Sequence, residues 1–327
     1  MSMSMAMIMS EVNHQRIKTN GIWLHIAEQG TGPLVLLLHG FPEIWYSWRH
    51  QLKYLANHGY HAVAPDLRGY GDSDSPISPS SYTFMHVVGD LLGLIDHFGE
   101  HQAFVVGDDW GANIGWHMSL FRPDRVKGFV AIGVPYFPRI PTIKTVEAIR
   151  MAYGDNTHVS QFQEPGRAER AFARYDCLTV MKKFMLATWT EFLAAPPGME
   201  IIDFLPTPSA LPSWITEEEL MVFADKFQES GFTGAFNYYR AMNLNWELLA
   251  PWEGSKITVP TKFIAGERDF GFKSSGGTKD YVEGDLFKSL VPNLEVVIMD
   301  GHHFIHQEKA QLVSDEILSF IRKLSSD

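Results

Sequence analysis

Short apolar runs alternate with longer amphipathic stretches through the first half of the chain, and the alternation returns near the C-terminus. The short runs carry no polar face, which indicates strands buried on both sides, and the longer stretches have helical spacing. This pattern predicts an α/β fold in which helices wrap a mostly parallel sheet. The expected strands are residues 22–27, 34–39, 62–65, 103–106, 128–133, 261–265 and 294–299, and the expected helices are residues 46–55, 84–98, 112–121 and 310–324.

The middle of the chain has a different pattern. It contains amphipathic helical segments such as residues 217–227 and 234–242, a proline-rich stretch at residues 205–212, and no run that resembles a buried strand. We therefore expect an all-helical insertion at residues 138–250, with residues 1–137 and 251–327 forming the sheet-containing core.

Composition narrows the class of protein. The 327 residues are 45% hydrophobic and 20% charged, the balance of a globular protein with a sizeable core. Lys and Arg number 27 against 38 Asp and Glu, so the net charge is −11 and no basic block offsets it. A nucleic-acid or anionic-membrane partner is therefore not expected, and the longest apolar runs are too short to span a bilayer.

Cysteine usage and the chain ends bear on location. The single cysteine, Cys177, excludes an intramolecular disulfide framework and fits a reducing compartment. Residues 1–9 alternate Met with small residues and lack the basic flank of a signal peptide, so we expect a frayed tail. These features predict a cytoplasmic protein.

The most informative segment is residues 104–112, where an expected strand runs directly into an expected helix. Gly107, Gly111 and Ala112 bracket Asp109 with small residues, the pattern of a tight turn that projects its central side chain at a helix N-terminus. This turn usually presents a serine nucleophile, and here it presents an aspartate. The chain has no G-x-S-x-G, and Cys177 lacks flanking glycines, which disfavours a serine or cysteine hydrolase. The alternative is an ordinary glycine-rich turn with a capping Asp.

Other segments offer partners for Asp109. The segment His-Gly-Phe-Pro at residues 39–42 follows an expected strand, so the backbone N–H groups of Phe41 and Trp110 are candidate donors to an oxyanion. Residues 66–73 also follow a strand, and we expect a structural turn there.

An acid and then a histidine are needed, in that order, to complete a catalytic triad. Asp269 follows the expected strand 261–265 and is the preferred acid, with Glu267 second. His303 follows the expected strand 294–299 and is preferred over His302. The alternatives are a turn Asp and a loop His without chemistry.

Two other kinds of site are disfavoured. His302, His303 and His306 lack the H-E-x-x-H pattern of a zinc site, and we expect no cluster of acidic ligands beside them. Residues 274–278 are rich in Ser and Gly but lack the lysine of a phosphate-binding loop, so we expect a flexible loop. No metal or cofactor is therefore predicted.

The segments at residues 39–42, 107–112, 266–269 and 301–304 together resemble the soluble epoxide hydrolases, especially the plant type. Residues 161–166 and 232–240 look like cap segments of that family, and the resemblance spans about residues 21–321. It implies an α/β-hydrolase core with a helical cap and a pocket between them. It also implies that Asp109 is the nucleophile, that Asp269 and His303 are its partners, and that Tyr239 is one of two cap tyrosines that hold the epoxide oxygen.

This chemistry suits the residue types. A carboxylate can open an epoxide at its saturated carbon and form an ester, and a tyrosine, with a pKa of about 10, can donate to the departing oxygen. His303, oriented by Asp269, can then activate the water that hydrolyses the ester to a vicinal diol. We therefore expect an epoxide hydrolase acting on a small-molecule epoxide.

The chain departs from the resembled pattern at two positions. Asp108 stands before the nucleophile where the family usually has His, and His158 stands where the family has its first cap tyrosine. Tyr153 lies five residues before His158 and is a candidate substitute. Asp108, and Glu43 beside the oxyanion loop, place further carboxylates near Asp109, so one acid is expected to be protonated. We expect a protonated His158 to share oxygen stabilisation with Tyr239.

Three alternatives stay open. An isomerase or cyclase would keep ring opening but lose hydrolysis, and both departures affect groups that handle water or the epoxide oxygen. A haloalkane dehalogenase also uses an Asp followed by Trp, although Tyr239 argues against it. A non-catalytic small-molecule receptor is disfavoured by the intact Asp109, Asp269 and His303. A homodimer also stays open.

Overall fold

Eight strands form one sheet in the computed structural model of the protein, which describes residues 12–273 and 277–325. In spatial order the strands are β1 (Asn13–Thr19), β2 (Ile22–Gln29), β4 (His61–Pro65), β3 (Leu34–Leu38), β5 (Ala103–Asp108), β6 (Val126–Ile132), β7 (Thr261–Gly266) and β8 (Leu294–Met299). The strand β2 pairs antiparallel with both β1 and β4, and the other neighbours pair in parallel. The expected α/β fold and its strands are confirmed.

The strand β1 was not expected from the sequence. It is mostly polar, and its side chains are largely exposed until Ile17 and Thr19, so no apolar run marks it. It is held by its pairing with β2, through a tight turn at Asn20 and Gly21, which both have positive φ angles of 48° and 83°. Two residues with positive φ are typical of the turn that joins adjacent antiparallel strands.

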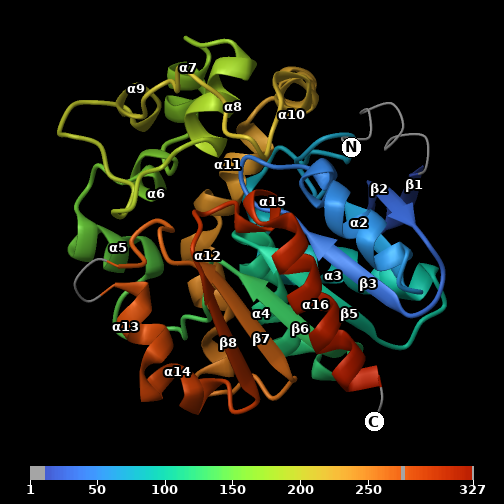
Figure 1. Ribbon diagram of the computed structural model, residues 1–327. Helices are drawn as coiled ribbons and strands as arrows, with labels where there is room; N and C mark the ends of the chain where they lie inside the picture. Colours follow the sequence, from blue (N-terminus) through green and yellow to red (C-terminus); the bar gives the residue numbers. More distant parts are fainter. Residues whose placement is uncertain (1–11, 274–276, 326–327) are drawn as a thin grey trace.

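Helices cover both faces of the sheet, as Figure 1 shows. On one face α2 (Arg49–Ala56) packs against α16 (Ala310–Ser325), and on the other α3 (Phe84–His97) packs against α4 (Trp110–Phe121). All residues of β3 and β5 are buried between these layers, because both of their faces meet apolar helices. The core therefore holds the ends of these two strands rigidly.

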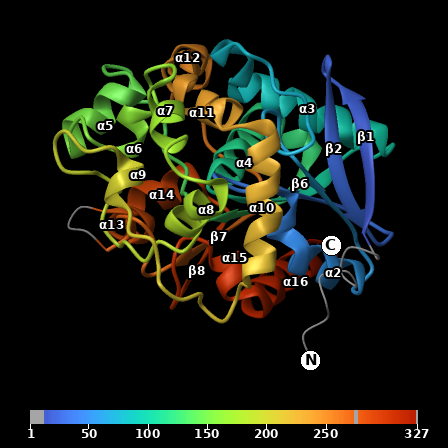
Figure 2. The same cartoon turned by 90° about the horizontal axis from the view of Figure 1, so that it is seen from above.

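Between β6 and β7 the described chain forms helices and no strand. Figures 1 and 2 show that these helices gather at one end of the sheet. The helix expected at residues 234–242 is interrupted at Ala241, which separates a helix ending at Arg240 from one beginning at Met242. The helices are α5 (Thr145–Tyr153), α6 (His158–Gln161), α7 (Arg167–Phe172), α8 (Cys177–Met185), α9 (Ile201–Phe204), α10 (Glu217–Ser230), α11 (Thr233–Arg240) and α12 (Met242–Leu248), all within the predicted insertion.

Short helices complete the core. They are the 3₁₀ helices η1 (Trp45–Trp48), η2 (Pro79–Tyr82), η3 (Pro123–Arg125) and η4 (Ala250–Trp252), and the α-helices α13 (Thr278–Glu283), α14 (Asp285–Leu290) and α15 (Ile305–Glu308). The tail expected at residues 1–9, and residues 274–276 of the expected flexible loop, lie outside the described residues. Within the described part of the chain, no helix is both long and apolar enough to cross a membrane.

Candidate active site

Asp109 occupies a strained turn between β5 and α4. Its backbone has φ 50° and ψ −113°, a conformation that side-chain-bearing residues rarely adopt. The turn needs small neighbours, because a Cβ added at Gly107 would lie 2.2 Å from the Gly111 carbonyl oxygen and one added at Gly111 would lie 2.0 Å from the Leu38 carbonyl oxygen. Backbone strain of this kind is typical of functional sites, where it holds a side chain in a required orientation. It therefore favours a functional role for Asp109 over a helix cap alone. The Asp109 side chain does not make the usual N-cap hydrogen bond to the second or third residue of α4.

Two backbone N–H groups donate hydrogen bonds to the Asp109 carboxylate. The loop after β3 brings the Phe41 N–H to 3.0 Å from Asp109 Oδ1, and the Trp110 N–H also bonds to this carboxylate. Gly40 permits the close approach, since a Cβ there would lie 2.5 Å from the Asp109 Cβ. The two expected donors therefore meet where an oxyanion would form on Asp109.

The acid and the histidine come together as expected. Asp269 follows β7 and His303 follows β8, and their Oδ1 and Nδ1 atoms lie 2.6 Å apart. The other ring nitrogen of His303, Nε2, lies 3.7 Å from Asp109 Oδ2. Asp269 Oδ1 also accepts the Phe270 N–H at 2.6 Å, which holds the acid in place. The alternative acid, Glu267, instead pairs with Lys273 at 3.1 Å.

The charges of this group depend on one another. Burial lowers the pKa of His303, but the charge and hydrogen bond of Asp269, with the charges of Asp108 and Asp109, raise it to about 10. Burial raises the pKa of Asp109, and His303 and the backbone N–H groups of Phe41 and Trp110 oppose that rise. The site therefore favours an imidazolium at His303 paired with the Asp269 carboxylate. The Asp109 side chain is 19% exposed, so a ligand can reach it.

Tyr239 faces this group from α11. Its ring lies edge-on to Trp110, with centroids 5.0 Å apart, and it is 5% exposed. Burial, followed by the charge of Asp109, raises its pKa well above the ordinary value. Tyr239 therefore stays protonated and can donate a hydrogen bond beside Asp109.

His158 lies next to Tyr239, with ring centroids 5.8 Å apart. Its Nδ1 is 3.2 Å from the Leu193 carbonyl oxygen, which can only accept, so Nδ1 carries the proton. Burial lowers the pKa of His158 to about 4, and the imidazole is neutral near pH 7. The expected protonated donor is therefore not found here. Tyr153 stacks on Phe192 at 3.9 Å and is 44% exposed.

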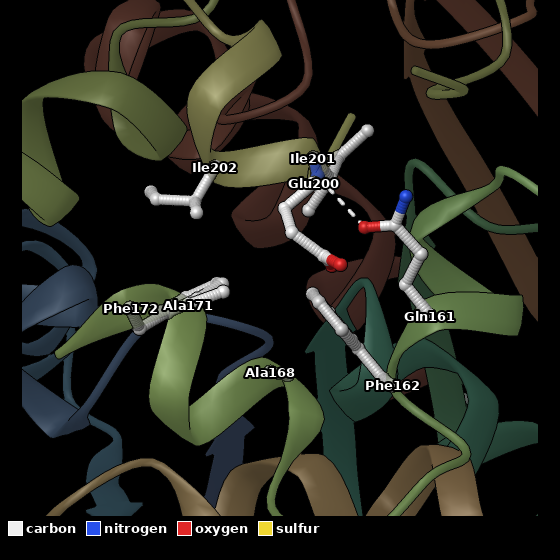
Figure 3. A pocket seen from close by; sticks show the side chains of 8 residues that line it. All are labelled: Gln161, Phe162, Ala168, Ala171, Phe172, Glu200, Ile201 and Ile202. Carbon is white, nitrogen blue, oxygen red and sulfur yellow. Dashed lines mark hydrogen bonds between the residues drawn. The ribbon is translucent and has the colours of Figure 1, made fainter. Parts of the chain in front are cut away.

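The helix that carries His158 is anchored inside the helical layer. Gln161 at its end accepts the Ile201 N–H through Oε1 at 2.7 Å, as Figure 3 shows, and donates to the Met199 carbonyl at 2.9 Å. The next residue, Phe162, lies edge-on to Tyr239 with centroids 5.0 Å apart. These contacts fix His158 and Tyr239 relative to each other.

The three late histidines belong to different pairs. His302 faces Glu308 at 3.2 Å, His303 faces Asp269, and His306 lies between Glu43 and Asp108. The expectation that no acidic cluster lies beside them is thus wrong for His306. Each ring nitrogen of His306 faces a different carboxylate, Nε2 facing Glu43 Oε1 at 3.2 Å and Nδ1 facing Asp108 Oδ1 at 3.7 Å. Its acidic neighbours come from distant parts of the chain, so no sequence spacing could have shown it.

An Asp presented on a strand–helix turn, with a histidine and an acid that follow later strands beside it, is the arrangement of a hydrolase site on an α/β sheet. The family described as alpha/beta hydrolase fold matches residues 33–199, and the chain belongs to it.

Comparison with known proteins gives the closer relationship. The chain is 53% identical to "Epoxide hydrolase 1" of Siraitia grosvenorii, over 96% of this chain and 100% of that protein. It is 38% identical to "Epoxide hydrolase A" of Mycobacterium tuberculosis, over 94% and 97% of the two chains. A solved Vigna radiata epoxide hydrolase mutant superposes with a TM-score of 0.93 at 48% identity, covering 96% and 99%. The chain is a member of the epoxide hydrolases.

Proposed function

We propose that the protein hydrolyses an epoxide to a vicinal diol through an ester on Asp109. The observation that carries the proposal is that the two carboxylate oxygens of Asp109 have different partners. Oδ1 accepts the Phe41 N–H at 3.0 Å, whereas Oδ2 faces His303 Nε2 at 3.7 Å. One oxygen is thus held where negative charge is stabilised, and the other is left for attack.

Ring opening uses Oδ2 as the nucleophile. Its electron pair forms a bond to an epoxide carbon, the bond from that carbon to the ring oxygen breaks, and the oxygen takes a proton from Tyr239. The phenolate is then reprotonated from solvent. The product of this step is a hydroxyalkyl ester of Asp109.

Ester formation also prepares the base. It removes the charge of Asp109, one of the charges that raise the pKa of His303, so the imidazolium can release its proton. Neutral His303 then takes a proton from water, the hydroxide adds to the ester carbonyl carbon, and the Phe41 and Trp110 N–H groups stabilise the oxyanion. Collapse expels the diol oxygen, which takes the proton back from His303, and leaves Asp109 as a carboxylic acid. Transfer of that acid's proton to His303 restores the carboxylate and the imidazolium.

A single turnover in ¹⁸O water tests this proposal. Because water attacks the carbonyl carbon of Asp109, the first product formed by excess enzyme should be unlabelled, and the label should appear in the protein. Mass spectrometry of the diol and of the peptide that contains Asp109 measures both. Label in the first diol would show direct attack by water, and a rearranged isomer in place of a diol would favour an isomerase or cyclase.

His158→Tyr should speed ester formation about tenfold. The neutral imidazole donates its only proton to the Leu193 carbonyl, whereas a phenol at this position would add a second donor for the epoxide oxygen, worth about 1.5 kcal/mol. Stopped-flow measurement of ester formation between pH 5.5 and 8.5 checks the rate. The wild-type profile should show no titration of His158 in this range, because its pKa is about 4. An equal or slower rate in His158→Tyr, with Tyr239→Phe as the control that must be slow, would contradict this prediction.

A small-molecule epoxide remains the proposed substrate. The cytoplasmic location stays a prediction from the sequence, and a homodimer stays an open alternative. Size-exclusion chromatography with light scattering measures the oligomeric state directly.

A further inference from the structure

Three ionisable side chains are enclosed directly behind the oxyanion loop. Glu43, Asp108 and His306 are each 0% exposed. His306 lies on α15 with Nε2 3.2 Å from Glu43 Oε1 and Nδ1 3.7 Å from Asp108 Oδ1. The Trp48 ring packs against the imidazole, with centroids 4.5 Å apart. Because burial of unpaired charge is costly, the arrangement of these groups requires a physical reason.

Glu43 connects His306 to the nucleophile. The Gly40 N–H donates to Glu43 Oε2 at 3.0 Å, and Gln307 Nε2 donates to Oε1 at 2.9 Å. The residue after Gly40 is Phe41, whose N–H reaches Asp109 Oδ1. A continuous set of contacts therefore runs from His306 through the Glu43 carboxylate to one of the two oxyanion donors.

We propose that His306 is a positioning residue for ester hydrolysis: it keeps Glu43 ionised, and the Glu43 carboxylate holds the backbone of Gly40 and Phe41 in the orientation that stabilises the oxyanion. This inference rests on the proposed function, because it concerns the second step of that reaction. It assigns His306 a role through Glu43 and the loop, without contact with substrate.

The charges support this assignment. Burial raises the pKa of Glu43, but the charge and hydrogen bond of His306, with the Gly40 N–H, lower it to about 2. Burial, followed by the charge of Glu43, raises the pKa of Asp108 well above its usual range. These opposite pKa shifts favour negative charge on Glu43, the carboxylate that binds the loop, over negative charge on Asp108.

The other charged and titratable groups around the cluster do not supply the positive charge that His306 places next to Glu43. Burial lowers the pKa of His39 and takes that of His50 to about 3, so both are neutral. Arg49 is directed to Gln307 Oε1 at 2.7 Å rather than to Glu43. The groups facing Asp108 from the catalytic side are His303, Asp109 and Asp269. Without His306, only neutral hydrogen-bond donors such as the Gly40 N–H and Gln307 would oppose the effect of burial on Glu43, and its pKa would rise.

The test separates the two steps of the reaction. Ester formation and ester decay are followed by quenched-flow mass spectrometry with styrene oxide between pH 5 and 8, for wild type, His306→Asn and His306→Asn/Glu43→Gln. In His306→Asn we expect ester decay to slow about tenfold at pH 5 and to recover towards pH 8 as Glu43 ionises, with ester formation within threefold of wild type. In the double variant this added pH dependence should disappear, because Gln does not titrate.

The matched control is His117→Asn. His117 is also buried, but its pKa of about 4 is set by burial and by a backbone bond to Asn113, with no contribution from a carboxylate among the described residues. Its variant should keep the wild-type pH profile. Equal slowing of both steps by His306→Asn at every pH, or slowing that persists unchanged in the double variant, would overturn the proposal.

A measurement on the wild type does not depend on the folding of a variant. Infrared difference spectroscopy, with Glu43→Gln to assign the band, should show the Glu43 carboxylate down to pH 4. Protonation of Glu43 above pH 5 would overturn the inference. If wild type forms no ester at all, the proposed function fails as well, whereas a wild-type ester with an unaffected His306→Asn variant overturns this inference alone.

Discussion

Asp109→Asn should lower the rate of epoxide opening by at least about 10⁴-fold. An amide oxygen lacks the charge that makes the carboxylate a nucleophile, and no other carboxylate replaces it: Asp269 is directed to His303 and Asp108 has a pKa raised well above its usual range. Single-turnover product formation and intact-mass measurement check the result. No adduct should form on the variant.

Two controls separate loss of chemistry from loss of structure. Asp124→Asn changes an exposed carboxylate far from the turn and should react as wild type does. In Asp109→Asn the imidazole of His303 should titrate below the wild-type value of about 10, since one of the charges that raise its pKa is gone. Turnover within tenfold of wild type by a folded Asp109→Asn protein would exclude Asp109 as the nucleophile.

His303→Gln should accumulate the ester. Ring opening needs the Asp109 carboxylate and Tyr239, whereas ester hydrolysis needs a base at position 303, and loss of a general base costs about 10²–10⁴-fold. Ring opening should also slow, but less than ester hydrolysis. It slows because removal of the imidazolium, which lies 3.7 Å from Asp109 Oδ2, makes the carboxylate harder to ionise. Intact mass after mixing with substrate should show the protein plus one epoxide.

The neighbouring histidine provides the control for this experiment. His302 faces Glu308 instead of the nucleophile, so His302→Gln should turn over without accumulating an adduct. Consumption of substrate by His303→Gln with no adduct at any time would mean that another group acts as the base.

The periodicity of the sequence was sufficient for most of the fold. Strands such as β3 and β5 are continuous apolar runs because both faces are buried, and such runs can be recognised without knowledge of their neighbours. The edge strand β1 could not be recognised in this way, because its polar residues are held by pairing with β2. Strand formation there depends on a partner instead of on local composition.

The sequence by itself determined the chemical identity and the order of Asp109, Asp269 and His303. Each lies in the loop that begins where a strand ends, and parallel strands bring such loops to one edge of the sheet. Only the tertiary structure decided how the surrounding groups are charged. His158 is neutral because it is buried against the Leu193 carbonyl, and Asp108 and Glu43 differ in ionisation because His306 and the Gly40 N–H favour the charged form of Glu43. The physical reason is that ionisation depends on solvent exclusion and on contacts between residues far apart in the chain, which residue spacing does not contain.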